Sequence, residues 1–345
     1  MTRVVARAPG KLILTGEYAV LSGAPALVAA VDRNAAVRLR LHGFAGPLAV
    51  ESRAEGEHWL VRDPNGEELT GGDLGAVLAA LRVVSARVPA LAGRGAEVSV
   101  DSTAFLADGK KLGLGRSAAT VTAAVAAFLA AAGHADPAET REAAIAAHVL
   151  FQGGHGSGAD VAAAVHGGVI EFRRNGGRLA IADRAVPDGL HVVVGWTGES
   201  MATDPVVRHF MAAIATRTPP VLADLCAVAE QAAAAAAAND ASAFATAVAR
   251  TATLLPILGE EVGIPIVTPS LARLVEAARD AGAVAKPSGA GGGDCGVAFA
   301  TSPAQADAVR AAWRDAGIVP LPLAIAAPGA RADLAVVGPR EISLG

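Results

Sequence analysis

The sequence predicts a mixed α+β protein built as two domains or as one large domain with two lobes. Two observations predict the mixture. Apolar segments separated by turn residues open the chain, whereas residues 203–282 carry apolar side chains at helical spacing. The third observation is the length, because 345 residues exceed what one hydrophobic core usually organises. Strands and helices mixed in this order are typical of the α+β class.

The N-terminal segment predicts antiparallel strands. Pro9-Gly10 and Ser22-Gly23 are turn signals between apolar runs. We expect strands at residues 4–8, 11–14, 26–31 and 35–41. The polar residues 51–73 that follow predict a hairpin or a loop excursion.

The rest of the chain mixes helices with further strands. We expect helices at residues 74–88, 117–132, 137–151 and 303–316, and a mostly helical region over residues 203–282. We expect strands at residues 98–100, 168–172, 179–182, 190–194 and 295–300, and a final short strand pair. A lobe boundary near Val186 and Pro187 divides the chain into an N-terminal lobe, residues 1–186, and a C-terminal lobe, residues 187–345.

Composition narrows the class of partner. With 52% hydrophobic and 18% charged residues the chain belongs among folded globular proteins. A net charge of -4 and a pI near 6.1 give no electrostatic footprint for nucleic acid or for an anionic membrane, so a small soluble substrate is expected.

The same composition bears on the compartment. Cys226 and Cys295 are far apart and lack metal-ligand spacing, so neither a disulfide framework nor a zinc site is expected. No signal peptide is visible, and apolar runs such as residues 118–132 are short and rich in alanine for a membrane span. We therefore expect a cytoplasmic protein.

The first segment with chemical character is ARAPGKLILTGEYAVLSG, residues 6–23. Its lysine, Lys11, follows Pro9-Gly10 in a strand context, and Glu17 and Tyr18 follow at a turn. Two interpretations stay open. Lys11 is an ordinary strand lysine with a solvated head group, or it is a fixed cation beside a phosphate or an acceptor hydroxyl.

The second segment is KKLGLGRSAATVTAA, residues 110–124, where a glycine-rich loop runs into a long helix. Glycine frees the backbone to approach a ligand, and the unpaired amides and dipole of the helix N-terminus favour an anion. Lys110, Lys111 and Arg116 strengthen the prediction of a phosphate site. The spacing differs from that of the Walker-type P-loop.

Two further segments are rich in glycine. In AKPSGAGGGDCGVAF, residues 285–299, so dense a glycine run favours close backbone approach to a ligand over a plain tight turn. In QGGHGSGADVAAAVHGG, residues 152–168, Asp160 lies in the first turn of a short helix, where it either complements the helix dipole or is catalytic. The nearby histidines lack zinc-site spacing and are interpreted as structural or substrate-contacting: His148, His155 and His166.

Taken together and in this order, these segments resemble the superfamily of galactokinases, homoserine kinases, mevalonate kinases and phosphomevalonate kinases, the GHMP kinases. APGKLILTGEYAV is similar to its first motif, GLGRSAA to its phosphate-binding second motif and KPSGAGGGDCG to its third. The resemblance spans nearly the whole chain. It implies a two-lobed α+β GHMP kinase fold with ATP and acceptor bound in the cleft between the lobes.

The resemblance also assigns roles to residues. It implies that Lys11 polarises or activates the acceptor, that Asp160 is a base or an electrostatic orienter, and that Ser117 helps to hold Mg2+. The implied nucleotide contacts are Gly113, Leu114, Gly115, Arg116, Ser117 and Ala118. The implied substrate contacts are Lys111, Ser157, Ser288, Gly291 and Thr203.

Within the superfamily the chain most resembles the phosphomevalonate kinases, at GEYAV, GSGADVAAAVHGG, GWTG and SGAGGGDCG. This implies ATP and Mg2+ as cofactors and phosphomevalonate as the small-molecule acceptor. The alternatives are a kinase for mevalonate or another small alcohol, and a ligand sensor without activity. Either a monomer or a homodimer is compatible with the sequence.

The chain departs from the family pattern at three places. Arg116 replaces the usual first serine of the second motif, and Val149 stands where mevalonate kinases have a metal-binding glutamate. Ala202-Thr203 follows GWTG where Ser-Thr is common. The change at Arg116 bears on how the nucleotide binds, and the change at Val149 bears on the ligands of the metal ion. The change at Ala202-Thr203 bears on the contacts to the acceptor.

Overall fold

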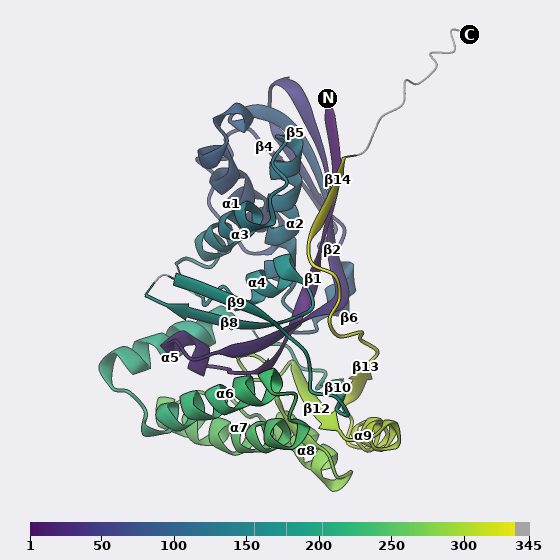
Figure 1. Cartoon of the computed structure of the whole chain (residues 1–345). Coiled ribbons are helices and arrows are strands. Elements are labelled where there is room, and N and C mark those ends of the chain that lie inside the picture. The colour runs from purple at the N-terminus through teal and green to yellow at the C-terminus, as the bar shows by residue number, and fades with distance from the viewer. Residues whose placement is uncertain (155, 177, 202, 335–345) are drawn as a thin grey trace, which may run out of the picture.

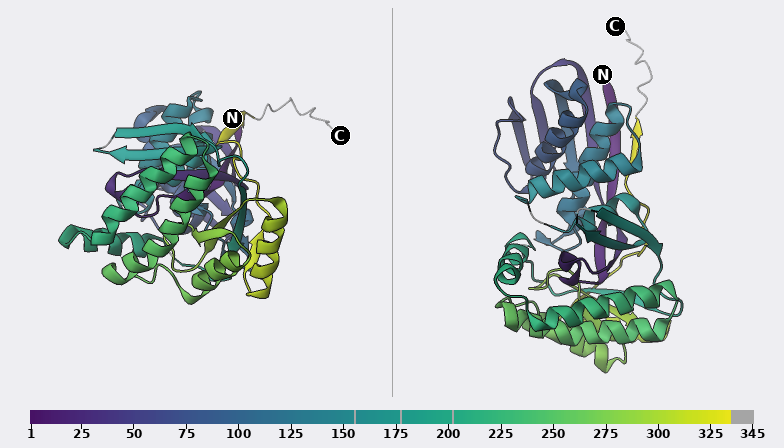
Figure 2. Two further views of the ribbon diagram at one scale, coloured as in Figure 1. Left: turned by 60° about the horizontal axis from the view of Figure 1, so that its bottom comes forward. Right: turned by 60° about the vertical axis from the view of Figure 1, so that its left-hand side comes forward.

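The structure is a computed structural model that describes residues 1–154, 156–176, 178–201 and 203–334. Within these residues two large sheets lie one above the other, each covered by its own helices, and two further strands form a small sheet of their own (Figure 1). The side view in Figure 2 shows an elongated molecule with a lobe at each end. The predicted two-lobed α+β fold is confirmed.

The upper sheet is mostly antiparallel and has the strand order β14-β1-β2-β5-β3-β4, with β8 pairing with β2 and with β9. Its strands are β1 Thr2–Thr15, β2 Ala26–Ala45, β3 Leu48–Ser52, β4 Glu57–Val61, β5 Arg94–Asp101, β8 Val169–Asn175, β9 Arg178–Arg184 and β14 Arg331–Leu334. Only β3 and β5 pair in parallel among these described strands.

The strands β1 and β2 are longer than the sequence predicts. Pro9-Gly10 does not end a strand, because β1 continues through a register shift between these two residues and stays paired with β2 on both sides of it. A bulge tolerates the missing N–H of proline. The predicted division of each strand into two pieces is therefore wrong. The sequence predicts a hairpin or a loop excursion over residues 51–73; a hairpin of β3 and β4 is present, but its first strand begins earlier, at Leu48.

Helices cover one face of the upper sheet, and α2 is the central one (Figure 1). They are α1 Gly72–Arg87, α2 Arg116–Ala131, α3 Pro137–Phe151 and α4 Ala159–His166. Helix α2 is buried from Ala118 to Ala130 and packs on β1 and β2. Its small alanine side chains let it approach the sheet closely, so the start of this helix is held in a fixed place.

Short elements connect these parts. They are the 3-10 turns η1 Ala19–Ser22, η2 Pro89–Leu91 and η3 Thr103–Phe105, and the strands of the small hairpin, β6 Leu106–Ala107 and β7 Lys110–Lys111. The hairpin places the two lysines of the second motif immediately before the glycine loop that starts α2.

The lower lobe is a four-stranded sheet, in the order β11-β12-β10-β13, with helices around it. Its strands are β10 His191–Trp196, β11 Val284–Pro287, β12 Cys295–Ala300 and β13 Val319–Leu321. Its helices are α5 Thr203–Thr216, α6 Pro220–Ala237, α7 Ala241–Val262, α8 Pro269–Asp280 and α9 Pro303–Asp315. The two short strands expected at the end of the chain join different sheets, because β13 pairs with β10 and β14 with β1.

Two helices of the lower lobe, α6 and α7, are long and apolar enough to cross a membrane by length and composition alone. That is weak evidence for a span, because core helices of globular proteins pass the same test. Here α6 and α7 pack on each other, and α7 also packs on β11. Their apolar residues are explained by this packing.

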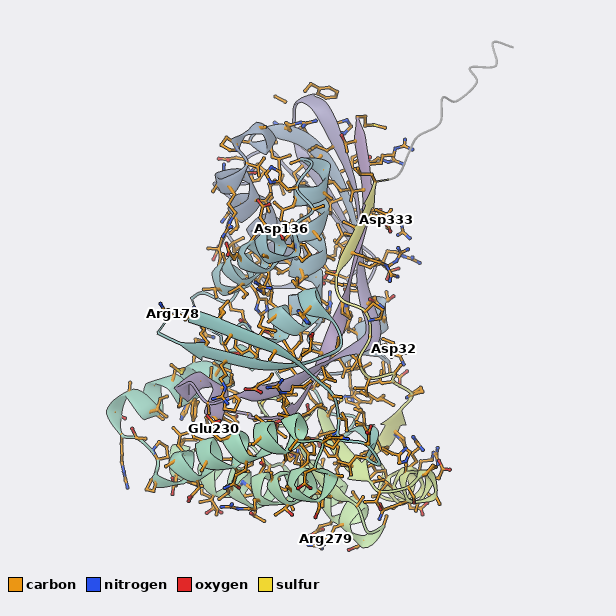
Figure 3. All side chains as sticks on the ribbon, viewed as in Figure 1. Asp32, Asp136, Arg178, Glu230, Arg279 and Asp333 are labelled. Carbon is orange, nitrogen blue, oxygen red and sulfur yellow. The ribbon has the colours of Figure 1, made fainter. Side chains whose placement is uncertain are left out.

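The lobes are joined by a shared core and by polar contacts. Leu12 and Leu14 of β1 belong to the same buried cluster as Phe299 of β12. On the surface Arg173 of β8 donates two hydrogen bonds, of 2.5 and 2.6 Å, to Glu230 of α6, whose position is labelled in Figure 3. This guanidinium lowers the pKa of the Glu230 carboxyl. The lobes thus share buried apolar contacts and a surface ion pair.

The predicted boundary at residues 186 and 187 falls between β9 of the upper sheet and β10 of the lower one. The chain nevertheless returns to the upper sheet at its end, where yellow β14 lies along purple β1 in Figure 1. The lobe limits of 1–186 and 187–345 stay a prediction.

Candidate active site

Three of the glycine-rich segments and β1 meet in one cleft, which consists of two adjoining pockets. The first pocket is bordered by Glu17, Tyr18, Ser157 and Ser288, and the second by residues of the loop that starts α2. The residues common to both pockets are Lys11, Gly113, Gln152, Asp160 and Asp294. Groups from both lobes therefore converge at the junction of the pockets.

The second pocket contains the N-terminus of α2. Gly115 is the N-cap, with a left-handed φ of 78°, and no side chain of the described residues caps this end. The backbone N–H of Lys11 donates to the carbonyl oxygen of Leu114 at 2.8 Å, which fixes the loop against β1. The uncapped amides and the helix dipole favour an anion here, as the sequence predicts.

The glycines of this loop make room for charged side chains. A Cβ at Gly113 would lie 2.5 Å from Cβ of Asp294, and a Cβ at Gly115 would lie 2.8 Å from Cγ of Lys11. Both residues have positive φ, where a side chain is also strained. Sequence reasoning explained such glycines by close approach to a ligand. In this loop they first allow Lys11 and Asp294 to lie against the backbone.

The glycines of the third segment face protein atoms. A Cβ at Gly291 would lie 2.1 Å from the carbonyl oxygen of Ile266, and one at Gly292 would lie 2.0 Å from the sulfur of Met201. Gly291, predicted to contact the substrate, is buried and borders neither pocket. Within this run Ser288, Gly289, Ala290 and Asp294 border the first pocket.

Lys11 and Asp160 lie where the pockets join. Lys11 comes from the middle of β1, and Asp160 comes from the first turn of α4, behind the left-handed N-cap Gly158. Both are half-buried and border both pockets. A cation and a carboxylate at one junction can orient a phosphoryl group and its acceptor.

Asp294 is a third charged group at this junction, and sequence reasoning did not single it out. Burial raises the pKa of its carboxyl to about 6, although Lys11 and Lys111 oppose the shift. Its backbone has a φ of 54°. The signal was available, since it is the one acidic residue in a glycine run of the third motif.

A buried ion pair lies behind the first pocket and was also missed. Nζ of Lys286 donates to a carboxylate oxygen of Glu17, and the two residues are 0% and 2% exposed. Lys286 also donates to the carbonyl oxygens of Pro287, at 3.0 Å, and Ile13, at 3.4 Å. Burial lowers the pKa of Lys286, and Glu17 opposes that shift. The pair joins β11 to the turn after β1.

Of the five predicted acceptor contacts, Ser157 and Ser288 border the first pocket, whereas Gly291 and Lys111 do not. The Ser288 hydroxyl donates to the carbonyl oxygen of Ile13 at 2.9 Å and accepts from its N–H at 3.2 Å, and Ser157 accepts from the N–H of Ala159 at 3.2 Å. Lys111 is exposed and borders the second pocket instead. Thr203 opens α5, but its side chain lies outside the described part of the chain.

The unusual Arg116 borders the second pocket but directs its guanidinium at protein groups. It donates to Ser102 Oγ at 2.8 Å and pairs with Glu55 at 2.7 Å and with Asp73 at 3.0 Å. Asp73 is buried at the start of α1 and also accepts a hydrogen bond of 2.7 Å from Ser52. The guanidinium thus ties α1 to α2. Ala118, predicted to contact the nucleotide, is buried inside α2 and borders neither pocket.

Ser117, the predicted metal ligand, borders the second pocket and lies 3.2 Å from Nε2 of the buried His148. No group of three or more His, Cys, Asp or Glu side chains among the described residues is placed to hold a metal ion. Mg2+ nevertheless fits, because it binds through one or two protein oxygens together with substrate phosphates, and Ser117 and Asp160 border one pocket.

The sequence also predicts a structural or substrate-contacting role for His155 and His166. His166 lies 2.5 Å from the exposed Asp183 and borders neither pocket. His155 lies outside the described residues.

The comparisons with known proteins agree with this geometry. Family models match at residues 76–168, for the N-terminal domain of GHMP kinases, and at residues 232–319, for their C-terminal domain. The phosphomevalonate kinase of Streptomyces sp. strain CL190 is 33% identical to the chain over 94% of it and 98% of that protein. The chain belongs to the GHMP kinase family, whose members are ATP-dependent phosphotransferases.

Two further similarities bear on the fold and on the acceptor. The mevalonate kinase of Thermococcus sibiricus is 29% identical over 96% of the chain and 98% of that protein. Among solved structures, the Streptococcus pneumoniae phosphomevalonate kinase in complex with phosphomevalonate and AMPPNP has a TM-score of 0.77 and 24% identity, covering 93% of this chain and 99% of that one. The family is thus defined, while relatives with different acceptors are similar to the chain.

Proposed function

We propose that this protein is a phosphomevalonate kinase of the mevalonate pathway, which transfers the γ-phosphoryl group of ATP to 5-phosphomevalonate. The observation that carries the proposal is the junction of two pockets at Lys11 and Asp160, with a helix N-terminus on one side and two serines on the other. The second pocket suits the phosphates of ATP. The first pocket suits a small acceptor.

The similarity to the Streptomyces phosphomevalonate kinase supports this choice of acceptor. It covers nearly the full length of both chains, and its 33% identity exceeds the 29% identity to the Thermococcus mevalonate kinase. The acceptor's terminal phosphate is already an anion, so its oxygen needs little deprotonation before attack. A new P–O bond forms to that oxygen as the bond between the γ-phosphorus and the β,γ-bridging oxygen breaks, which leaves a diphosphate and ADP.

Catalysis by such a site rests on charge and position. Lys11 neutralises charge that develops on the transferred group, and the amides at the start of α2 hold the neighbouring phosphates. Asp160 orients Lys11 and the acceptor. Ser117 and Asp160 would hold Mg2+, which when bound supplies further neutralisation of the phosphate charge.

An acceptor panel tests the proposal. Phosphomevalonate, mevalonate, galactose and homoserine are each offered with MgATP, and ADP formation is measured. We expect kcat/KM for phosphomevalonate to exceed that for each alcohol by at least about 10²-fold, since a site built for an anion leaves its charged groups unpaired with a neutral group.

Faster turnover of mevalonate would contradict the proposed acceptor and favour a mevalonate kinase, a reading that the Thermococcus relative supports. ATP binding without turnover of any acceptor would favour a ligand sensor.

A further inference from the structure

The side chain of Asp294 borders both pockets at their junction. Among the described residues, its carboxylate accepts a long hydrogen bond, of 3.4 Å, from the backbone N–H of Met201. The side chain lies over Gly113, whose missing Cβ leaves the space for it. It therefore borders the place where the last phosphate of a nucleotide in the second pocket would meet an acceptor in the first.

The backbone of Asp294 is held in an uncommon conformation. Its φ of 54° lies in the left-handed region, which non-glycine residues rarely adopt. Two backbone hydrogen bonds fix it, from its own N–H to the carbonyl oxygen of Glu199 at 3.3 Å and from the N–H of Thr197 to its carbonyl oxygen at 2.9 Å. Residues held in this way often have a functional role.

The charge around Asp294 is mixed. Lys11 faces it from β1 and Lys111 from the small hairpin, while Asp160 borders the same two pockets from α4. Of the remaining neighbours, Glu199 directs its carboxylate to the Ser270 hydroxyl at 2.6 Å, and the thiol of Cys295 is buried with a raised pKa. The hydrogen bond from Met201 and the two lysines thus oppose the rise in the pKa of Asp294 that burial causes.

A bound phosphate changes this balance. Its negative charge competes for Lys11 and for the amides of the α2 loop, and two anions in one half-buried junction repel each other. A carboxylate oxygen can contact a phosphate oxygen only if one of them carries a proton. The carboxyl of Asp294 is suited to take that proton, because burial already raises its pKa to about 6.

We propose that Asp294 takes up one proton from solvent when MgATP binds and, as a carboxylic acid, donates a hydrogen bond to a γ-phosphate oxygen at the junction. The inference rests on the proposed kinase function and adds a nucleotide-binding residue to it. The proton returns to solvent when the nucleotide leaves. Asp294 thereby lets the site recognise a phosphoryl group without adding negative charge beside it.

The test uses the full-length protein and the non-hydrolysable analogue Mg·AMPPNP. Titration calorimetry in two buffers of different ionisation enthalpy, repeated between pH 6.5 and 8.5, gives the dissociation constant and the number of protons taken up. On binding Mg·AMPPNP, the wild type should take up as much as one proton more than Asp294→Asn does. Above pH 7, the affinity of the wild type should fall about tenfold per pH unit relative to the affinity of the variant. An Asp183→Asn control, at an exposed carboxylate that borders neither pocket, keeps the extra proton.

The contrary results are equally distinct. Equal proton uptake in wild type and Asp294→Asn overturns the inference, and so does a loss of affinity in Asp294→Asn at pH 6.5, which would mean that the ionised carboxylate is needed. Failure of Mg·AMPPNP to bind the wild type overturns the kinase proposal itself.

A second measurement does not depend on the variant folding. Infrared difference spectra of the wild type at pH 7.5, with and without Mg·AMPPNP, should show a carbonyl band of a protonated carboxylic acid that shifts in heavy water. Absence of that band overturns the inference.

Discussion

Two lysines lie where the upper and lower lobes meet, and they have opposite surroundings. Lys11 of β1 is half-buried, lies along Gly115 and borders both pockets. Lys286 of β11 is fully buried and bound to Glu17. One ammonium group is available to a ligand, whereas the other is neutralised by the protein and holds the lobes together. Sequence motifs that contain both lysines do not distinguish the two roles; burial and partners do.

The largest expected effect is on stability and comes from the buried lysine. Replacement Lys286→Met leaves the Glu17 carboxylate buried without its counter-charge, which typically costs about 3–5 kcal/mol. Urea denaturation followed by circular dichroism measures the loss. The double variant Glu17→Met/Lys286→Met should regain most of it, because no unpaired charge remains. A single variant as stable as the wild type would show that the pair contributes nothing.

The next effect is on turnover and comes from Lys11. Replacement Lys11→Met should lower kcat by about 10²–10³-fold, the usual cost of losing one group that stabilises the transition state. The affinity for Mg·AMPPNP should change little, because the amides of the α2 loop remain. Coupled ADP detection and calorimetry measure the two quantities. Wild-type turnover in this variant would contradict the role given to Lys11.

The smallest expected effect is on turnover and comes from Gly115. A pair of alanine variants distinguishes the cost of backbone strain from the cost of displacing Lys11. Gly115→Ala introduces a side chain at a φ of 78° and pushes on Lys11, whereas Gly133→Ala, just after the same helix, introduces one at a φ of 85° with no atom within 4 Å. Both variants should lose about 1–2 kcal/mol of stability from the left-handed backbone. We expect only Gly115→Ala to lose turnover as well, by about tenfold, a cost set by displacement of a catalytic group.

Equal turnover of the two alanine variants would show that the contact between Gly115 and Lys11 has no part in catalysis. Thermal denaturation and initial-rate measurements on the same preparations provide the comparison.

Much of the fold follows from local sequence signals. The helices predicted at residues 117–132 and 137–151 correspond to α2 and α3 within one residue, because apolar spacing and the glycine and proline signals agree there. The lengths of β1 and β2 did not follow. Pairing between the two strands overrides the local turn preference of Pro9-Gly10, and pairing is not visible in one segment alone.

The residues of the candidate site likewise fall into those that the sequence predicted and those that it did not. Lys11, Ser117 and Asp160 were predicted because each lies in a motif with its own physical logic, and the structure brings all three to one cleft. Asp294 and the pair of Glu17 with Lys286 were missed, although all lie in quoted motifs. Glu17 and Lys286 are 269 residues apart in the sequence, and Asp294 faces Lys11 and Lys111 from other segments. A linear pattern does not give such partners.

The strand β14 has a consequence for how the protein is made. Residues 331–334 complete the upper sheet by pairing with residues 4–7. During synthesis from the N-terminus, the edge of β1 at residues 4–7 stays open until residues 331–334 have left the ribosome. The N-terminal half therefore has an unpaired strand edge until this distant segment follows, and slowed translation before residue 331 prolongs the period in which that edge can pair with another nascent chain.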